Sequence, residues 1–301
     1  MTRAHNFNAG PAVLPLKVVE ETRDAVNNFN NLGMSIMEIS HRSKDFDAVI
    51  KEAQSDALKI MGLSDEYYVI FVGGGASMQF AMVPMNFMHK KADYLVTGEW
   101  ATKAHKEAKQ FGEAVAAASS ADANFNYIPK NVKWSDDADY VHITTNNTIY
   151  GTRITDIPNV GKLRYVADMS SDFLSREMNY SQFDLIYAGA QKNIGPAGAT
   201  MVVIKKEWLE TANSNIPTML KYKTHVDKES LFNTPPCLPI YVIHRTFKWI
   251  MEQGGLAAIE KVNNHKAGIV YNAIDTMNDF YKGSVKEKID RSIMNITFKI
   301  G

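Results

Sequence analysis

The sequence of 301 residues has little cysteine: Cys237 is its single thiol. One thiol cannot close an internal disulfide, so we expect the fold not to depend on oxidation. Cys237 lies inside a proline cluster, residues 235–239, without the CxxC or His spacing of a metal ligand or redox motif. We interpret it as a small buried apolar residue, and we predict no metal site.

The sequence also lacks an excess of charge of either sign, because Lys plus Arg and Asp plus Glu each number 33. This balance gives no electrostatic reason to expect nucleic acid or an anionic membrane as the main partner. No apolar run approaches the ~18 residues of a membrane helix, and the first residues show no pattern of a signal peptide. We therefore expect a cytoplasmic protein that holds any anionic ligand in a local site.

What the sequence does contain is a series of short apolar runs separated by helical patterns. Several runs are continuous rather than alternating, which is typical of a sheet buried on both faces. Helical spacing extends over 16–32, 44–61 and 101–118, and Ser43 and Gly62 are the N-cap and C-terminal stop of the second helix. The expected strands are 67–72, 94–96, 140–144, 163–167, 183–187 and 200–204. We predict an α/β fold with a mostly parallel sheet flanked by helices.

The chain is expected to divide into three parts: an N-terminal arm at 1–16, a large domain at 17–255, and the beginning of a smaller α+β domain at 256–301. In the last part the pattern predicts a helix over 256–280 and a strand over 293–300. The expected buried face of that helix consists of Ile259, Val262, Ile269, Ile274, Met277 and Phe280. One helix and one strand cannot build a core of their own, so we expect this second domain to be incomplete.

A glycine-rich turn, Gly73-Gly74-Gly75-Ala76-Ser77, follows the first predicted strand and precedes a helix expected from Met78. Glycines let backbone N–H groups approach an anion, and the helix start adds unpaired N–H groups and a positive dipole end. The turn is therefore a candidate phosphate cradle, with Ser77 as an added hydroxyl donor. It matches neither GxGxxG nor a Walker A loop, and a purely structural turn explains the same glycines equally well.

Two charged residues follow consecutive predicted strands. Asp168 lies just past the strand 163–167, where a carboxylate can pair with a pyridinium nitrogen; the alternative for this residue alone is a turn or N-cap aspartate. Lys192 follows the next strand among small residues, in Ala188-Gly189-Ala190-Gln191-Lys192-Asn193. Desolvation there favours a neutral, nucleophilic amine, whereas most lysines are solvated at the surface.

Trp100, after the predicted strand 94–96, offers an aromatic face that can stack on a flat ring. Without the other features, a tryptophan of the hydrophobic core is the better interpretation. One chemistry uses a phosphate cradle, a stacking aromatic, a strand-end aspartate and a strand-end lysine together: that of pyridoxal 5'-phosphate (PLP) enzymes.

Six short motifs support a PLP enzyme. In residue types and in order along the chain they resemble the motifs of the phosphoserine aminotransferase family. The motifs are residues 7–11, 40–43, 73–80, 167–171, 190–193 and 233–236. The resemblance runs over the whole sequence. It implies the fold type I of PLP enzymes, an aspartate-aminotransferase-like fold with a seven-stranded-type sheet.

The resemblance also implies roles by position. Lys192 would form the Schiff base and shuttle the proton, and Asp168 would face the pyridinium nitrogen. The other implied cofactor contacts are Ala76, Ser77 and Gln191 at the phosphate, Trp100 and Thr148 at the ring, and Asn233 and Thr234 at the phosphate of a neighbouring subunit. The last pair implies a homodimer with shared sites. His41 and Arg42 would bind the phosphate of the substrate, and Arg suits a doubly charged phosphate through bidentate hydrogen bonds; without the resemblance they are equally well a solvated turn.

The family reaction transfers an amino group between O-phospho-L-serine and 2-oxoglutarate in serine biosynthesis, and members also act on 4-phosphohydroxy-L-threonine in pyridoxine biosynthesis. The family pattern continues beyond Gly301. The arginine expected to bind the substrate α-carboxylate therefore has no counterpart in these residues, and Arg291 matches a structural segment instead. Ser77 stands where some members have a basic residue.

Three alternatives remain open from the sequence. One is another fold type I PLP enzyme, such as a serine–glyoxylate type aminotransferase or a cysteine desulfurase, for which Cys237 is a poor nucleophile. The second is a nucleotide-binding protein that uses the glycine turn. The third is a truncated, non-catalytic dimer that binds PLP or nothing.

Overall fold

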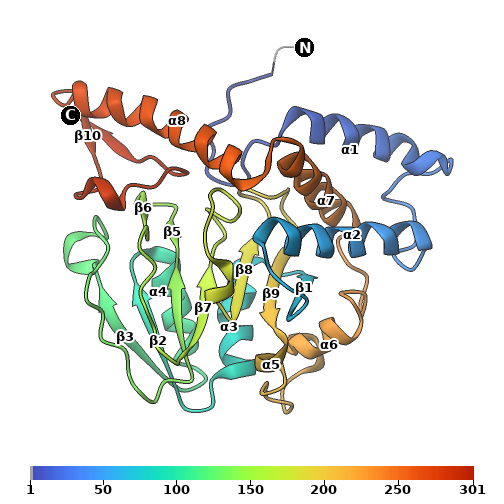
Figure 1. Ribbon diagram of the computed structural model, residues 1–301, viewed down its shortest axis with the longest axis horizontal. Coiled ribbons are helices and arrows are strands. Elements are labelled where there is room, and N and C mark those ends of the chain that lie inside the picture. Colours follow the sequence, from blue (N-terminus) through green and yellow to red (C-terminus); the bar gives the residue numbers. More distant parts are fainter. Residues whose placement is uncertain (1–2) are drawn as a thin grey trace.

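The computed structural model describes residues 3–301. Its centre is a seven-stranded sheet with the order β1-β9-β8-β7-β4-β2-β3 (Figure 1). β9 runs antiparallel to both of its neighbours, and the remaining pairs are parallel. The strands are β1 (Tyr67–Val72), β2 (Lys91–Val96), β3 (Glu113–Ser119), β4 (Tyr140–Thr144), β7 (Arg164–Asp168), β8 (Leu185–Gly189) and β9 (Thr200–Lys205). The predicted mostly parallel α/β fold is confirmed.

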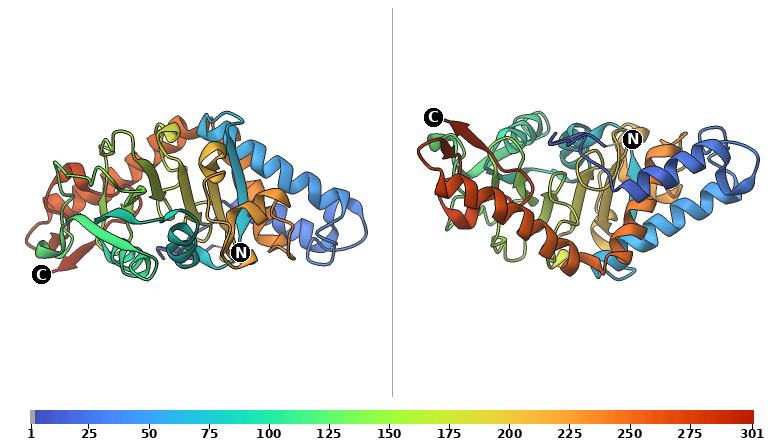
Figure 2. Two further views of the ribbon diagram at one scale, coloured as in Figure 1. Left: turned by 90° about the horizontal axis from the view of Figure 1, so that it is seen from below. Right: turned by 90° about the horizontal axis from the view of Figure 1, so that it is seen from above.

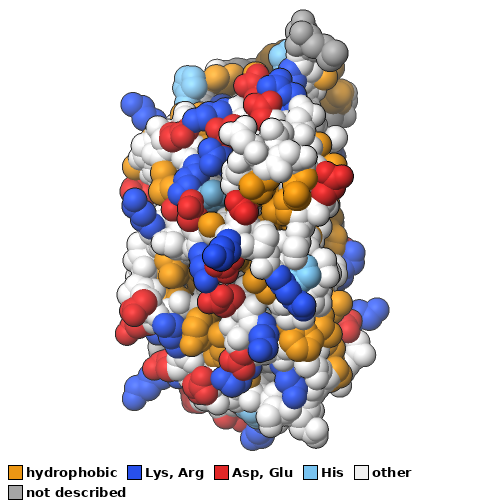
Figure 3. All heavy atoms as spheres, turned by 90° about the vertical axis from the view of Figure 1, so that its right-hand side faces the viewer, with side chains coloured by type: hydrophobic (Ala, Val, Ile, Leu, Met, Phe, Trp, Pro, Cys, Tyr) orange, Lys and Arg blue, Asp and Glu red, His pale blue; other side chains and the backbone are white. Residues whose placement is uncertain are grey.

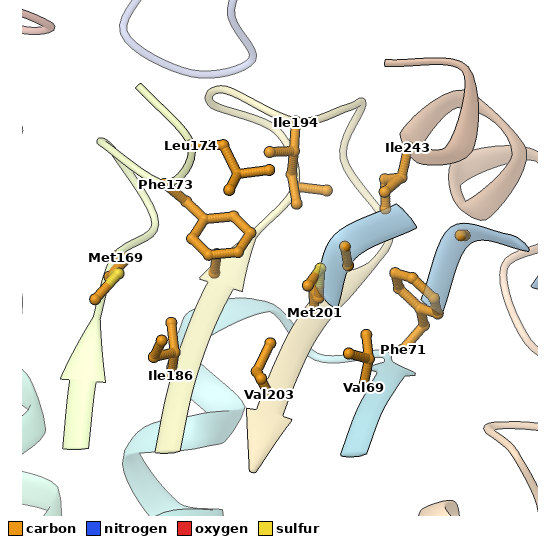
Figure 4. Packing of buried hydrophobic residues seen from close by; sticks show 14 of the residues in the cluster. Val69, Phe71, Met169, Phe173, Leu174, Ile186, Ile194, Met201, Val203 and Ile243 are labelled. Atoms are coloured by element: carbon orange, nitrogen blue, oxygen red, sulfur yellow. The ribbon is translucent and has the colours of Figure 1, made fainter. Parts of the chain in front are cut away.

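Helices cover both faces of this sheet (Figure 2), which explains why its strands are continuously apolar. On one face, Phe71, Met201 and Ile243 belong to a single buried cluster (Figure 4). Alternate strand residues such as Val72 and Val202 point to a second cluster on the opposite face. The flanking helices include α1 (Leu16–Asn28), α2 (Lys44–Met61), α3 (Gly75–Phe87), α4 (Glu99–Ala108), α5 (Lys206–Leu209), α6 (Tyr222–Asp227) and α7 (Cys237–Glu252).

Parallel pairing brings the carboxyl ends of several strands to one edge of the sheet. Thr144 pairs with Asp168, and Asp168 pairs with Tyr187. Gly189 and Val72, at the ends of β8 and β1, both lie opposite Thr200 in β9. The glycine turn after β1, Asp168 and the segment leading to Lys192 therefore all leave the sheet at this edge.

The ends of the predicted helix 44–61 are confirmed by its caps. Ser43 Oγ accepts a hydrogen bond from the Phe46 backbone N–H at 3.2 Å, and Gly62 has φ 64° after the last turn. The predicted helix 16–32 is shorter, because the chain leaves α-helical geometry at Asn28. Asn30 and Asn31 then take left-handed φ values of 48° and 60°.

The prediction of one helix over 101–118 was wrong in its second half. α4 ends at Ala108, and residues 113–119 form β3. The alanine-rich sequence of β3 suits a helix, but β3 pairs in parallel with β2 over its length. Tertiary pairing at the edge of the sheet thus overrides local propensity.

The last part of the chain contains α8 (Gly255–Thr276), β10 (Tyr281–Gly283) and β11 (Phe298–Ile300). The predicted buried face of its helix was largely wrong: Ile274 is buried, whereas Val262, Ile269, Met277 and Phe280 are about half exposed, at 47–60%. α8 extends past the main sheet (Figure 1), so most of its apolar stripe meets no second layer. The predicted strand 293–300 is also shorter, since only its last three residues pair with β10.

Two short strands, β5 (Asn146–Asn147) and β6 (Thr152–Arg153), form a small separate ribbon after β4. Cys237 begins α7 and packs against the core, but it is half-buried rather than buried as predicted, because it lies at the start of the helix. Within residues 3–301, no helix combines the length and apolar character needed to cross a membrane.

Candidate active site

Lys192 lies in the turn that follows β8, and its side chain is mostly withdrawn from water. Its Nζ donates a hydrogen bond to Thr148 Oγ1 at 2.7 Å. Burial lowers the pKa of Lys192, and the nearby charges of Asp168 and Asp172 only partly oppose this effect. The structure therefore increases the neutral fraction of an amine whose nucleophilic form is the neutral one.

Asp168 ends β7 and is 3% exposed. Its Oδ1 accepts a hydrogen bond from the Ser170 backbone N–H at 2.9 Å. Burial raises the pKa of Asp168, and the charge of Lys192 is the main opposing influence. In the part of the chain that the structure describes, neither Asp168 nor Lys192 takes part in an ion pair within 4.0 Å, so each keeps unused capacity for a ligand.

Trp100 lies in the first turn of α4, and Lys192 Nζ is 5.7 Å from the centroid of its ring. Lys103 Nζ contacts the same ring at 4.5 Å. Trp100 Nε1 is buried and has no hydrogen-bond partner among residues 3–301. An indole face beside a reactive amine, with an orphaned donor, fits a flat polar ligand.

The glycine turn is positioned as a cradle at the same edge. α3 begins at Gly75, three residues earlier than expected, so the N–H groups of Ala76 and Ser77 belong to its unpaired first turn. A Cβ added to Gly73 or Gly75 would meet nothing within 4 Å, whereas one on Gly74 would collide with Met78. The turn thus leaves open space beside a helix N-terminus, as an anion site requires.

Gln191 lies next to this edge, since a Cβ on Gly189 would come within 2.8 Å of Gln191 Oε1. The structure therefore brings together most of the predicted cofactor contacts of one chain: Ala76, Ser77, Trp100, Thr148, Asp168, Gln191 and Lys192. The group can attack an electrophile, balance a cationic ring nitrogen, stack on a flat ring and bind an anion.

Four predicted residues do not join this group within the chain. His41 and Arg42 precede α2, whose first turn lies with the α1–α2 connection beyond the β1 edge of the sheet (Figures 1 and 2). Asn233 and Thr234 are exposed before α7, and the Asn233 side chain donates to the Thr234 carbonyl at 3.2 Å. The predicted roles of these four residues stay predictions.

Sequence reasoning missed the polar residues that lie behind Asp168. Tyr187 pairs with Asp168 across β7 and β8, and its hydroxyl is 2.8 Å from His142 Nε2. Burial lowers the pKa of His142 to about 3, so this imidazole is neutral at physiological pH. The signal that could have revealed this contact is the presence of a histidine and a tyrosine within otherwise apolar strands.

Comparison with known proteins also indicates an aminotransferase, over nearly the whole chain. The family described as aminotransferase class-V matches residues 4–301. A phosphoserine aminotransferase from Lysinibacillus sphaericus is 51% identical over 302 residues, which cover 99% of this chain and 83% of that protein.

Solved structures agree with this match. The phosphoserine aminotransferase of Bacillus circulans subsp. alkalophilus superposes with a TM-score of 0.96 at 46% identity, covering 99% of this chain and 84% of that chain. The PLP-bound phosphoserine aminotransferase of Trichomonas vaginalis superposes with a TM-score of 0.94 at 38% identity and the same coverage. The chain belongs to the class-V aminotransferases, and within them to the phosphoserine aminotransferase family.

Proposed function

We propose that this chain is a PLP-dependent transaminase that moves the amino group between O-phospho-L-serine and 2-oxoglutarate, in L-serine biosynthesis. Action on 4-phosphohydroxy-L-threonine, in pyridoxine biosynthesis, belongs to the same proposal. The observation that carries it is a desolvated Lys192 amine that lies beside the Trp100 ring and near the buried Asp168 carboxylate, in a chain of this family.

The residues present fit PLP. Trp100 would stack on its ring, Asp168 would face the ring nitrogen, Thr148 would contact the ring hydroxyl, and the first turn of α3 with Gln191 would hold its phosphate. When bound, PLP supplies a reactive carbonyl and an electron sink for negative charge on the substrate α-carbon.

The chain itself supplies binding, orientation and proton transfer. With PLP bound, Lys192 would hold the cofactor, and its Nζ, once freed by an amino substrate, would serve as the base and acid that moves one proton. The lowered pKa of Lys192 keeps that amine available. The Asp168 carboxylate, in a dry site, would favour a protonated ring nitrogen, which the electron sink requires.

We further propose a homodimer with shared sites, in which His41 and Arg42 bind the substrate phosphate and Asn233 and Thr234 bind the cofactor phosphate of the partner. Support comes from the position of the first turn of α2, which follows His41 and Arg42 and lies beyond the β1 edge of the sheet (Figure 1). The arm and α1–α2 region also exposes several apolar side chains: Val13, Leu16, Val19, Leu32, Met34 and Met37. The outer face near α1 and α2 mixes both charge signs with apolar side chains (Figure 3), which suits a protein contact better than nucleic acid.

The division into an arm (1–16), a large domain (17–255) and the start of a small domain (256–301) is part of this proposal. The half-exposed apolar face of α8 supports it, because such a face normally packs against a second layer. The cytoplasmic location expected from the sequence stays a prediction.

The test is the visible absorbance of the purified chain loaded with PLP, recorded before and after addition of O-phospho-L-serine. A yellow protein whose colour bleaches with phosphoserine, and whose borohydride-reduced form carries the label on Lys192, would establish cofactor and half-reaction together. The variant Lys192→Ala is the control and should bind no covalent cofactor. A yellow chain that responds to serine or alanine but not to phosphoserine would indicate another aminotransferase of this fold. A chain without a bound chromophore would contradict the proposal.

A further inference from the structure

The N-terminal arm is joined to the loop that carries Lys192. Residues 3–15 form neither helix nor strand. The backbone N–H of Ala12 donates to the Gln191 carbonyl at 2.8 Å. The arm is thus hydrogen-bonded to the residue directly before the reactive lysine.

Gly10 of the same arm meets the lysine side chain itself. A Cβ at this position would lie 3.0 Å from Lys192 Cγ and 3.7 Å from the Gln191 carbonyl oxygen. Carbon atoms prefer separations of about 3.5–4.0 Å, so a single added methyl group would displace either the arm or the lysine. The φ of Gly10 lies outside the left-handed region. The close approach to Lys192, and not backbone conformation, is what requires glycine here.

The contact is local to the lysine loop. Phe7, three residues before Gly10, is 94% exposed, so the beginning of the arm is not packed on the rest of the chain. The Lys192 side chain is held at two points: Gly10 borders its stem at Cγ, and Thr148 Oγ1 accepts a hydrogen bond from its Nζ. A stem fixed in this way limits the rotamers that Nζ can adopt.

We propose that Gly10 and Ala12 are positioning residues for Lys192: Gly10 leaves the space that the lysine stem occupies, and the Ala12–Gln191 hydrogen bond keeps the arm over it. This inference rests on the proposed role of Lys192 as the cofactor lysine. Coverage by the arm also keeps water from the stem, in agreement with the burial that lowers the pKa of Lys192.

The first test is PLP capture by the cofactor-free chain, followed by the rise of visible absorbance. In Gly10→Ala, we expect the apparent affinity to fall roughly five- to a hundredfold, the range typical of overpacking. Gly268→Ala is the matched control, because a Cβ there would meet nothing within 4 Å. It should capture PLP like the wild type. Capture by Gly10→Ala at wild-type affinity would overturn the proposal, as would a fall in melting temperature with unchanged affinity of the folded protein.

The second test compares Ala12→Pro, which removes the N–H donor, with Ala12→Gly, which keeps it. The readout is the rate at which acetic anhydride modifies Lys192 in the cofactor-free chain as a function of pH, measured by peptide mass spectrometry. We expect the midpoint to move to higher pH in Ala12→Pro alone, because water reaches the amine. Equal midpoints in both variants would overturn the proposal, and this pair decides if Gly10→Ala does not fold. If the wild-type chain captures no PLP, the proposed function fails, whereas the acetylation profile still reports on the arm.

Discussion

The sheet region at 44–252 and the C-terminal segment at 255–301 contain the same kinds of residue in opposite surroundings. In the sheet region, Phe247 is fully buried and burial raises the pKa of Asp168. In the C-terminal segment, Phe280 is 47% exposed. There, hydrogen bonds from Arg291 and Lys288 lower the pKa of Asp275 to about 2.

The difference shows how the candidate site gains its reactivity. Asp275 has permanent cationic partners and remains an ordinary surface carboxylate. Asp168 and Lys192 are desolvated without such partners, so their charges stay available for a ligand. Structural and functional charges are thus distinguished by pairing and burial rather than by residue type.

The largest expected effect is on stability and concerns the two phenylalanines, Phe247 in the sheet region and Phe280 in the C-terminal segment. Phe247→Ala should lower the free energy of unfolding by about 3–5 kcal/mol, because it opens a cavity in the core. Phe280→Ala, in the C-terminal segment, should cost less than about 1 kcal/mol. Urea unfolding followed by circular dichroism measures both. Equal losses would show that Phe280 is covered in solution.

The second effect concerns the buried carboxylate. Asp168→Asn should lower the transamination rate by roughly 30- to 5,000-fold, which corresponds to the about 2–5 kcal/mol lost when one partner of a buried charged pair is removed. Asp275→Asn is the surface counterpart and should retain the wild-type rate. Single-turnover absorbance changes with phosphoserine give the comparison. A loss below threefold in Asp168→Asn would remove Asp168 from the site.

A smaller effect, of opposite sign, is expected at the lysine. Lys192→Met should stabilise the cofactor-free chain by about 1 kcal/mol, because a desolvated amine is replaced by an apolar side chain. The folded-state pKa of Lys192 lies below its unfolded value. The cost of this lysine is therefore complete below the folded pKa and disappears as pH rises toward the unfolded value. The advantage of Lys192→Met should accordingly shrink near pH 10.

Thermal unfolding between pH 7 and 10 checks this prediction, with Lys162→Met, at an exposed lysine, as the control. A control variant that gains as much stability as Lys192→Met would contradict the interpretation.

The smallest effect is expected at the surface ion pair. The pKa of Asp275, lowered to about 2, means that its carboxylate contributes stability above the unfolded value and loses it as pH falls through about 2. Because this carboxylate is still in contact with solvent, Asp275→Asn should cost under about 1 kcal/mol at pH 7, and less in high salt. Chemical unfolding at pH 7 and near pH 2 measures it, and an undiminished loss at the lower pH would be the contrary result.

Much of the fold followed from local patterns. The cap residues Ser43 and Gly62 fixed both ends of α2, and the apolar runs located six strands of the sheet to within a few residues. The prediction failed where the composition of a segment is compatible with both helix and strand. The alanine-rich segment 113–119 was expected to be helical, but it forms β3. Its pairing partner, β2, lies outside the segment on the other side of α4, so no signal within 113–119 distinguishes helix from strand.

The candidate site was predictable to a similar extent. Lys192, Asp168, Trp100 and the glycine turn were found because each follows a predicted strand, and parallel strands end at one edge. Tyr187 and His142 were missed, since nothing local shows that their side chains meet within the core. Gly10 was expected as part of the N-terminal arm and of the motif 7–11, and its contact with Lys192 joins segments that are far apart in the chain.

The sequence by itself determined the α/β fold, the order of the site motifs and the residue types able to hold PLP, because helix periodicity, caps and strand-end positions are local properties. Only the tertiary structure decided which of these groups are desolvated, which are paired, and which face of α8 is left exposed. Burial and pairing depend on what packs from elsewhere in the chain, and those contacts set the charge of Asp168 and the reactivity of Lys192.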